Sequence, residues 1–377
     1  MVTTSPTNLP MSVPDDIQAA LAAGAVVAIG VSGGKDSQAT GLAVAEHLAD
    51  IGHTGQVCLV HADLGRVEWD ESLPVSQRLA DHLGLELIVV RRKAGDLMDR
   101  WLGRWANNLR RYTDLECMKL IPPWSTAKMR FCTSELKTDV IAAALRKRFK
   151  TETIISVTGI RAEESIKRAR MPAHQPHGKL TNKKGTAIGW TWNPIIRATK
   201  PQVFDAIAGA GLELHEAYTK YGTSRVSCRF CILASGADLS AAANADETHA
   251  LYREMCDLEL ESTFSFQAQR WLSTVRTELL GPTGVERIKS AMDKSWRREQ
   301  AEAKLPEGML YVKHWPVRAP TMEEAEVVAE VRREVAAIMG IEIRYNTADA
   351  VLARITELLA IKDAKDAAKA ARKRKKS

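Results

Sequence analysis

Short apolar runs alternate with amphipathic segments along the first half of the chain, and this alternation constrains the fold more than any other feature. Four predicted strands cover residues 25–31, 56–61, 85–90 and 153–158. Helical periodicity follows the first, second and third of them, over residues 37–49, 73–83 and 140–149. Because parallel strands need crossover connections, this pattern predicts an α/β fold with a parallel sheet covered by helices on both faces.

The pattern becomes almost entirely helical in the second half of the chain, which suggests a further module. We expect four regions, namely a loose leader, a catalytic α/β domain, a mostly helical C-terminal module and a basic tail. Their predicted bounds are residues 1–14, 15–235, 236–361 and 362–377.

The composition and the N-terminal sequence together indicate the cellular compartment of the protein. The longest apolar stretch is too short to span a bilayer, and the N-terminus lacks the basic and apolar blocks of a secretion signal. Six cysteines in 377 residues do not indicate a disulfide framework in a chain without such a signal. We therefore expect a protein of the reducing cytoplasm with no membrane partner.

Positive charge is concentrated in two regions. Residues 91–200 hold 24 Lys or Arg against nine Asp or Glu, and residues 362–377 hold eight against two, whereas the whole chain carries only +7. This asymmetry indicates an anionic partner, with DNA or RNA as the candidate. Two alternatives explain the same composition. Residues 91–200 could form a solvated face whose charges pair with the acidic rest of the chain, and the tail could serve only to increase solubility.

The most informative segment is the loop that follows the first predicted strand. It reads Ser32, Gly33, Gly34, Lys35, Asp36, Ser37, and a helix begins at once. Paired glycines let the backbone approach a ligand, and free N–H groups at a helix start suit a phosphate. The serines add hydroxyl donors and Lys35 adds a charge, while Asp36 is a candidate Mg²⁺ ligand. A glycine turn capped by serine, without a ligand, is the alternative.

This segment resembles the signature of the PP-loop ATP pyrophosphatase superfamily, whose fold is adenine nucleotide alpha-hydrolase-like. The resemblance implies that the loop binds the pyrophosphate end of ATP, or the matching region of an adenylyl sulfate. Asp63, at the end of the second strand, looks like the acidic strand end that borders the nucleotide in this group. The block from Gly159 through Arg161 to Arg168 resembles that of phosphoadenosine phosphosulfate (PAPS) reductase-like proteins, which implies phosphate or sulfate contacts by both arginines.

Cys228 and Cys231 form a CxxC pair, which suits one metal or cluster. Cys132, followed by Lys137, resembles the cysteine site of assimilatory adenylyl-sulfate reductases and of DNA phosphorothioation sulfurtransferases. With Cys117 as a fourth ligand, the set would hold a [4Fe–4S] cluster. Structural Zn²⁺, or a redox pair at Cys228 and Cys231 with no metal, remain open.

The resemblance implies an enzyme of adenine-nucleotide-dependent sulfur chemistry. We expect ATP and Mg²⁺ at the loop, with Lys35, Asp36 and Arg161 as catalytic residues, adenylation of an acceptor such as nucleic acid, and sulfur transfer with release of AMP. A separate protein would supply the sulfur. The first alternative is thiol-dependent reduction of PAPS or adenylyl sulfate to sulfite, although the C-terminal cysteine of true PAPS reductases is absent. The second is a non-enzymatic nucleotide- or nucleic-acid-binding protein.

Overall fold

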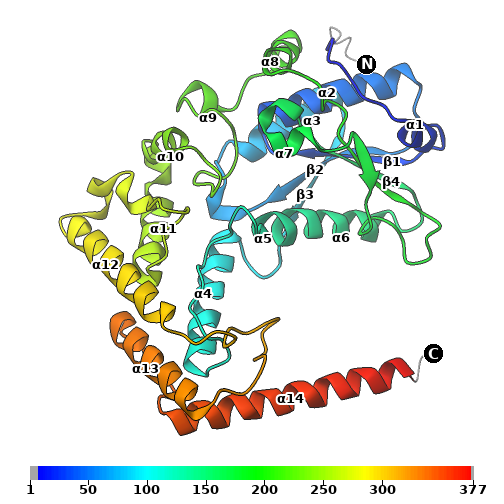
Figure 1. Cartoon of the computed structure of the whole chain (residues 1–377). Coiled ribbons are helices and arrows are strands. Elements are labelled where there is room, and N and C mark those ends of the chain that lie inside the picture. Colours follow the sequence, from blue (N-terminus) through cyan, green and yellow to red (C-terminus); the bar gives the residue numbers. More distant parts are fainter. Residues whose placement is uncertain (1–6, 375–377) are drawn as a thin grey trace. The chain divides into compact units, whose positions relative to one another are not determined.

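The computed structural model describes residues 7–374 and divides the chain into two compact units (Figure 1). Within the described residues, unit 1 comprises 7–98 and 125–252, and unit 2 comprises 99–124 and 253–374. The predicted leader and the predicted basic tail are therefore described only in part, because residues 1–6 and 375–377 lie outside the described range.

Unit 1 is built on a six-stranded sheet with the order β3-β2-β1-β4-β6-β5. All neighbouring strands are parallel except β5, which runs antiparallel to β6. The strands are β1 (Val26–Val31), β2 (Val57–Asp63), β3 (Glu86–Arg91), β4 (Ile154–Val157), β5 (His174–Pro176) and β6 (Gly189–Trp192). The four predicted strands are β1 to β4, so the predicted parallel sheet is confirmed.

Helices cover both faces of this sheet, as predicted. Val27 and Ile29 of β1 pack in one core with α1, α2, α3 and α8, whereas Val26 and Ala28 point into a second core with α6. This alternation explains why β1 is apolar along nearly its whole length. The helices of unit 1 are α1 (Asp15–Ala22), α2 (Lys35–Asp50), α3 (Ser72–Leu83), α5 (Phe131–Thr133), α6 (Asp139–Arg148), α7 (Ile166–Ala169), α8 (Lys200–Gly209), α9 (Glu216–Thr219) and α10 (Gly236–Ala243).

Unit 2 is helical, which confirms the predicted helical C-terminal region. Its long helices are α4 (Leu97–Thr113), α11 (His249–Ser262), α12 (Gly284–Ala303), α13 (Met322–Met339) and α14 (Ala348–Arg374). Val328 of α13 packs against Val351 and Ile355 of α14 in the core of this unit. A reciprocal capping box between Thr321 and Glu324 starts α13.

The observed division of the chain differs from the predicted linear one. Residues 99–124, inside the predicted catalytic domain, belong to unit 2, and the later change of unit falls between residues 252 and 253. The reason is the apolar face of α4, because Trp101 stacks edge-on with Trp124 and Phe266 in the interior of unit 2. Among the described residues, no helix combines the length and the apolar character that crossing a membrane requires.

Candidate nucleotide site

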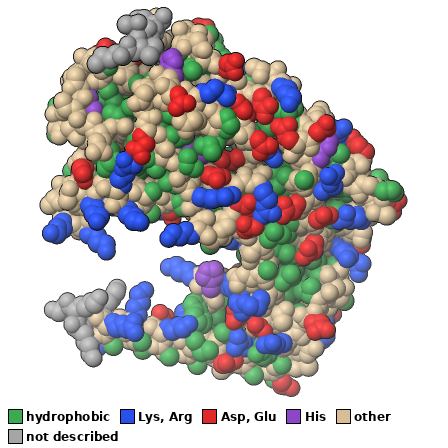
Figure 2. All heavy atoms as spheres, turned by 180° about the vertical axis from the view of Figure 1, so that it is seen from behind, with side chains coloured by type: hydrophobic (Ala, Val, Ile, Leu, Met, Phe, Trp, Pro, Cys, Tyr) green, Lys and Arg blue, Asp and Glu red, His purple; other side chains and the backbone are tan. Residues whose placement is uncertain are grey.

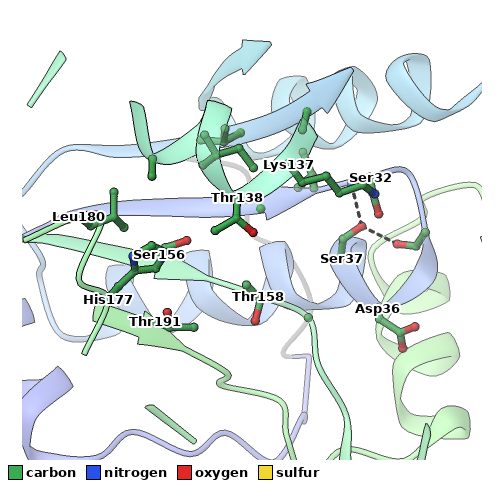
Figure 3. Close-up of a pocket in the computed structure, with 18 of the residues that line it drawn as sticks. Ser32, Asp36, Ser37, Lys137, Thr138, Ser156, Thr158, His177, Leu180 and Thr191 are labelled. Carbon is green, nitrogen blue, oxygen red and sulfur yellow. Dashed lines mark hydrogen bonds between the residues drawn. The ribbon is translucent and has the colours of Figure 1, made fainter. Parts of the chain in front are cut away.

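The loop between β1 and α2 is fixed by its own side chains and by a steric constraint. The Ser37 hydroxyl accepts a hydrogen bond from the Ser32 amide at 3.3 Å and donates one to the Gly34 carbonyl at 2.8 Å (Figure 3). Gly33 has a φ of +72°, and a Cβ there would lie 2.8 Å from the backbone oxygen of Ser72. Glycine satisfies both constraints, so the backbone can turn sharply into the N-terminus of α2, where an anion is favoured.

A cavity of about 780 Å³ opens beside this loop, at the carboxyl ends of β1 and β4. Figure 3 shows its two ends, with Ser32 and Ser37 at one and His177 and Leu180 at the other. Hydroxyl groups of Thr138, Ser156, Thr158 and Thr191 line the space between or beside them, and apolar lining comes from Val60, Ala62, Ile141 and Ala142. The lining thus combines an anion-binding loop with hydroxyl and apolar groups.

Four cations line the cavity against two acids. Arg168 pairs with Glu164, which also lines the cavity, and Lys179 pairs with Asp139. Within residues 7–374, Lys137 and Arg225 form no ion pair with a carboxylate. These two side chains therefore give the cavity an uncompensated positive charge, which favours an anionic ligand.

Lys137 reaches the cavity from an irregular part of its helix. Residues Ser134–Thr138 form a π-helical turn between α5 and α6, and both Lys137 and Thr138 line the cavity. Such turns bulge from a helix and are frequent at functional sites.

Asp36 lies on the cavity wall and is held by two buried cations. Its Oδ2 accepts from Lys35 Nζ at 2.7 Å and its Oδ1 accepts from Arg161 Nε at 2.5 Å. Lys35 and Arg161 are only 3% and 2% exposed. Burial lowers the pKa of Arg161, but hydrogen bonds and charges from Glu163 and Asp36 outweigh it, so the pKa is raised overall. Arg161 is therefore a permanent cation that orients Asp36.

The predicted site residues fall into two groups around this cavity. Six of them line it, namely Ser32, Gly34, Asp36, Ser37, Gly159 and Arg168. Gly33, Lys35, Asp63 and Arg161 do not line it. Asp63 Oδ1 accepts from the Gly65 amide at 2.7 Å, and its other oxygen faces Arg91 Nε at 3.4 Å. A Cβ on Gly159 would lie 2.7 Å from the Asp36 carbonyl, so glycine permits the close approach of this loop to α2.

Tyr218 is a site residue that the sequence analysis missed. Its hydroxyl accepts hydrogen bonds from the Lys35 amide at 3.4 Å and the Val226 amide at 3.1 Å, and its ring lines the cavity. Burial raises the pKa of Tyr218 to about 12, so the phenol stays protonated. Tyr218 thus links the start of α2 to the loop that carries the CxxC pair. Its position just before that loop was the only signal in the sequence.

Three of the predicted cysteine ligands, Cys132, Cys228 and Cys231, belong to unit 1. Burial raises the pKa of the Cys228 thiol, Lys137 opposes this shift, and Cys231 and Cys132 add to it. Cys231 Sγ accepts from the Leu233 amide at 3.5 Å and from Arg225 Nη2 at 3.8 Å. Because Lys137 and Arg225 also line the cavity, both cations connect the cysteines with the candidate ligand space.

Cys117, the predicted fourth ligand, belongs to unit 2. It is buried there, accepts a hydrogen bond from Asn108 Nδ2 at 3.6 Å, and burial raises its pKa to about 11. Over residues 7–374, no three His, Cys, Asp or Glu side chains are grouped as a metal site requires. The described residues therefore show no metal site, and the [4Fe–4S] cluster and Zn²⁺ both remain predictions.

A parallel sheet with a glycine turn between its first strand and the following helix, beside a cation-lined cavity, is typical of α/β nucleotide-binding domains. Residues 26–234 match the family described as "Phosphoadenosine phosphosulfate reductase domain". The chain belongs to this family, which confirms the resemblance found in the sequence.

Among solved structures, the phosphoadenylyl-sulfate (PAPS) reductase from Candida auris, in its phosphate complex, is similar to this chain. The sequence identity is 12% and the TM-score is 0.33, and the alignment covers 54% of this chain and 80% of that chain. The comparison with curated proteins gives no match.

Proposed function

We propose that unit 1 binds an adenine nucleotide in the 780 Å³ cavity and performs sulfur chemistry on it. The observation that carries this proposal is the position of Lys137 and Arg225, which line the cavity and also act on the cysteines of unit 1. The anionic end of the nucleotide would lie on residues 32–37, and its base would lie toward Ile141 and Leu180. Membership of the PAPS reductase domain family supports adenine-nucleotide sulfur chemistry in general.

The specific reaction that we propose begins with ATP. An acceptor oxygen attacks the α-phosphorus, the bond to the β-phosphate oxygen breaks, and pyrophosphate leaves. A sulfur nucleophile then forms a bond to the acceptor atom and displaces AMP. Lys137 and Arg225 would stabilise the negative charge that develops on the phosphates.

Asp36 would be the Mg²⁺ ligand, because its carboxylate lies on the cavity wall and Mg²⁺ prefers oxygen ligands while keeping several waters. Bound there, the ion would supply neutralisation of phosphate charge. The buried cations Lys35 and Arg161 would hold this carboxylate in place. They would act as positioning residues, with no direct contact to the ligand.

No step of this reaction depends on an iron–sulfur cluster or zinc. Anaerobic purification with iron, sulfide and zinc analysis tests the predicted metal separately. Loss of metal in Cys228→Ser and Cys231→Ser but not in Cys117→Ser would assign it to unit 1.

A second reaction is favoured by the contact between Arg225 and Cys231. The Cys231 thiolate would attack the sulfur of PAPS or adenylyl sulfate, expelling the adenine nucleotide and forming a cysteine S-sulfonate. The Cys228 thiol would then attack the cysteine sulfur, releasing sulfite and leaving a disulfide. Sulfate sulfur gains two electrons, and the two thiols lose them.

Product analysis separates these reactions. Pyrophosphate release from ATP, measured with and without DNA or RNA, supports the first, and sulfite formation from PAPS with a dithiol supports the second. Binding of nucleotide without formation of pyrophosphate or sulfite would indicate a non-enzymatic nucleotide-binding protein. We further propose the reducing cytoplasm as the site of action, since all six cysteines are free, and a separate protein as the sulfur donor.

A further inference from the structure

Helix α14 of unit 2 changes character along one of its faces. Val351, Ile355 and Leu358 are buried on this face, and the first two pack in the core of unit 2. Beyond Leu358 the same face becomes cationic. At 3.6 residues per turn, the three apolar residues and four cations lie within about 100° of one another. The cations are Lys362, Lys365, Lys369 and Arg372.

These four residues, which we call the basic stripe, extend about 15 Å along the helix axis. Among residues 7–374, none of the four forms an ion pair with a carboxylate. Asp363 and Asp366 lie beside the stripe and not within it. Figure 2 shows Lys and Arg side chains gathered along the end of α14, at the lower left of the view. The stripe therefore presents a row of uncompensated positive charges to solvent.

An aromatic ring lies on this stripe. Lys365 Nζ is 4.8 Å from the ring centroid of Trp315. Trp315 belongs to a tight turn closed by two hydrogen bonds with Val312, of 2.9 and 3.1 Å between backbone N and O. Lys313 and His314 at the tip of this turn are exposed and have φ values of 49° and 73°. The turn thus holds a half-buried indole next to Lys365.

We propose that the basic stripe and Trp315 bind a single-stranded nucleic acid. Lysines and arginines along one line neutralise successive phosphates, and an adjacent aromatic ring stacks on a base. An anionic membrane fits less well, because from residue 362 to residue 374 the uncharged positions of α14 are all alanine. Helices that lie in a membrane surface carry large apolar residues. Only the identification of this nucleic acid as the acceptor of sulfur rests on the proposed function.

Fluorescence anisotropy of the full chain with a labelled single-stranded oligonucleotide, without adenine nucleotide, tests the inference. The variant with all four stripe residues changed to Gln should bind at least about tenfold more weakly at low salt. Its slope of log affinity against log salt should fall in magnitude by about 3, as expected for four lost phosphate contacts on a single strand. Trp315→Ala should weaken binding several-fold and leave the salt slope unchanged, because stacking releases no counterions.

A matched control removes four cations from another helix of unit 2, through Arg287→Gln, Lys289→Gln, Lys294→Gln and Arg297→Gln on α12. This control should bind within about twofold of the wild type, and circular dichroism should show all variants folded. Equal loss in both quadruple variants, or binding to phosphatidylserine vesicles in place of oligonucleotide, would overturn the inference. Since no adenine nucleotide is present, a failure of the cavity to bind ATP or PAPS would leave this result unchanged.

Discussion

Arg161 Nε lies 2.5 Å from Asp36 Oδ1, although the two residues are 125 positions apart in the sequence. This ion pair connects the loop after β4 to the first turn of α2, which follows β1. The position of the Asp36 carboxylate therefore depends on the segments that follow both strands. Lys35 holds the other oxygen of the same carboxylate at 2.7 Å. The pair therefore sets the geometry of one wall of the cavity.

Arg161→Gln should reduce both stability and nucleotide affinity. The substitution leaves Asp36 with Lys35 alone in a partly buried site, and breaking a buried pair in this way costs about 3 kcal/mol. Urea unfolding measures this loss. Arg148→Gln, which removes an exposed pair with Glu86, is the control and should change stability little. Equal effects of the two substitutions would show that the pair with Asp36 is not structurally special.

Gly33→Ala should distort the loop after β1. Alanine at this position would have to keep the left-handed backbone conformation of Gly33. Its Cβ would also lie 2.8 Å from the backbone oxygen of Ser72. We expect a loss of about 2 kcal/mol in the free energy of unfolding and loss of nucleotide binding. Gly103→Ala in α4 is the matched control, because nothing lies within 4 Å of its Cβ, and it should stabilise the protein by about 0.5 kcal/mol or more. Retained nucleotide affinity in Gly33→Ala would argue against the loop as the anion site.

His215 should make stability depend on pH. Burial lowers the pKa of His215 to about 4, whereas the unfolded chain has a value near 6.5. Between these values the unfolded state binds more protons, so the stabilisation is complete above pH 6.5 and is lost as the pH falls toward 4. From pH 6.5 to pH 5 the wild type should lose about 2 kcal/mol more than His215→Asn.

The asparagine in this variant keeps an acceptor for the Ala217 amide, which donates to His215 Nδ1 at 3.0 Å. Urea unfolding at both pH values measures the difference. Parallel pH profiles for the two proteins would show that His215 does not titrate in this range on unfolding.

Lys137→Gln and Arg225→Gln should weaken the binding of an anionic nucleotide without affecting stability. Neither cation forms an ion pair with a carboxylate in the described part of the chain, so no carboxylate loses a partner. We expect about tenfold weaker binding for each, which corresponds to about 1.4 kcal/mol. Lys179→Gln is the control on the same cavity, because Lys179 is paired with Asp139. Calorimetry that gave the same loss for all three variants would contradict the assigned roles.

The sheet was predictable because each of β1 to β4 is a short, nearly continuous apolar run between helical segments. β5 and β6 were missed because they are short and, unlike the equally short β4, neither is a nearly continuous apolar run. The membership of α4 in unit 2 was also missed, since its packing partner Phe266 lies far along the chain.

The loop of the site was predictable because strand, glycines and helix start are contiguous in residues 26–37. The lining that Tyr218 and Arg225 contribute was not predictable, because these two residues reach the cavity only through the fold. The direct phosphate contact predicted for Arg161 remains a prediction. The proposed function gives Arg161 a positioning role instead, because its Nε donates to Asp36 Oδ1 and its side chain does not line the cavity.

Titration calorimetry with ATP and with PAPS tests the central claim most directly. The wild type should bind at least one of them, inorganic pyrophosphate should compete, and Gly33→Val should abolish the heat while Gly103→Ala retains it. Absence of binding to the folded wild type at millimolar nucleotide, or unchanged binding in Gly33→Val, would contradict the claim that the loop after β1 holds the anionic end of an adenine nucleotide.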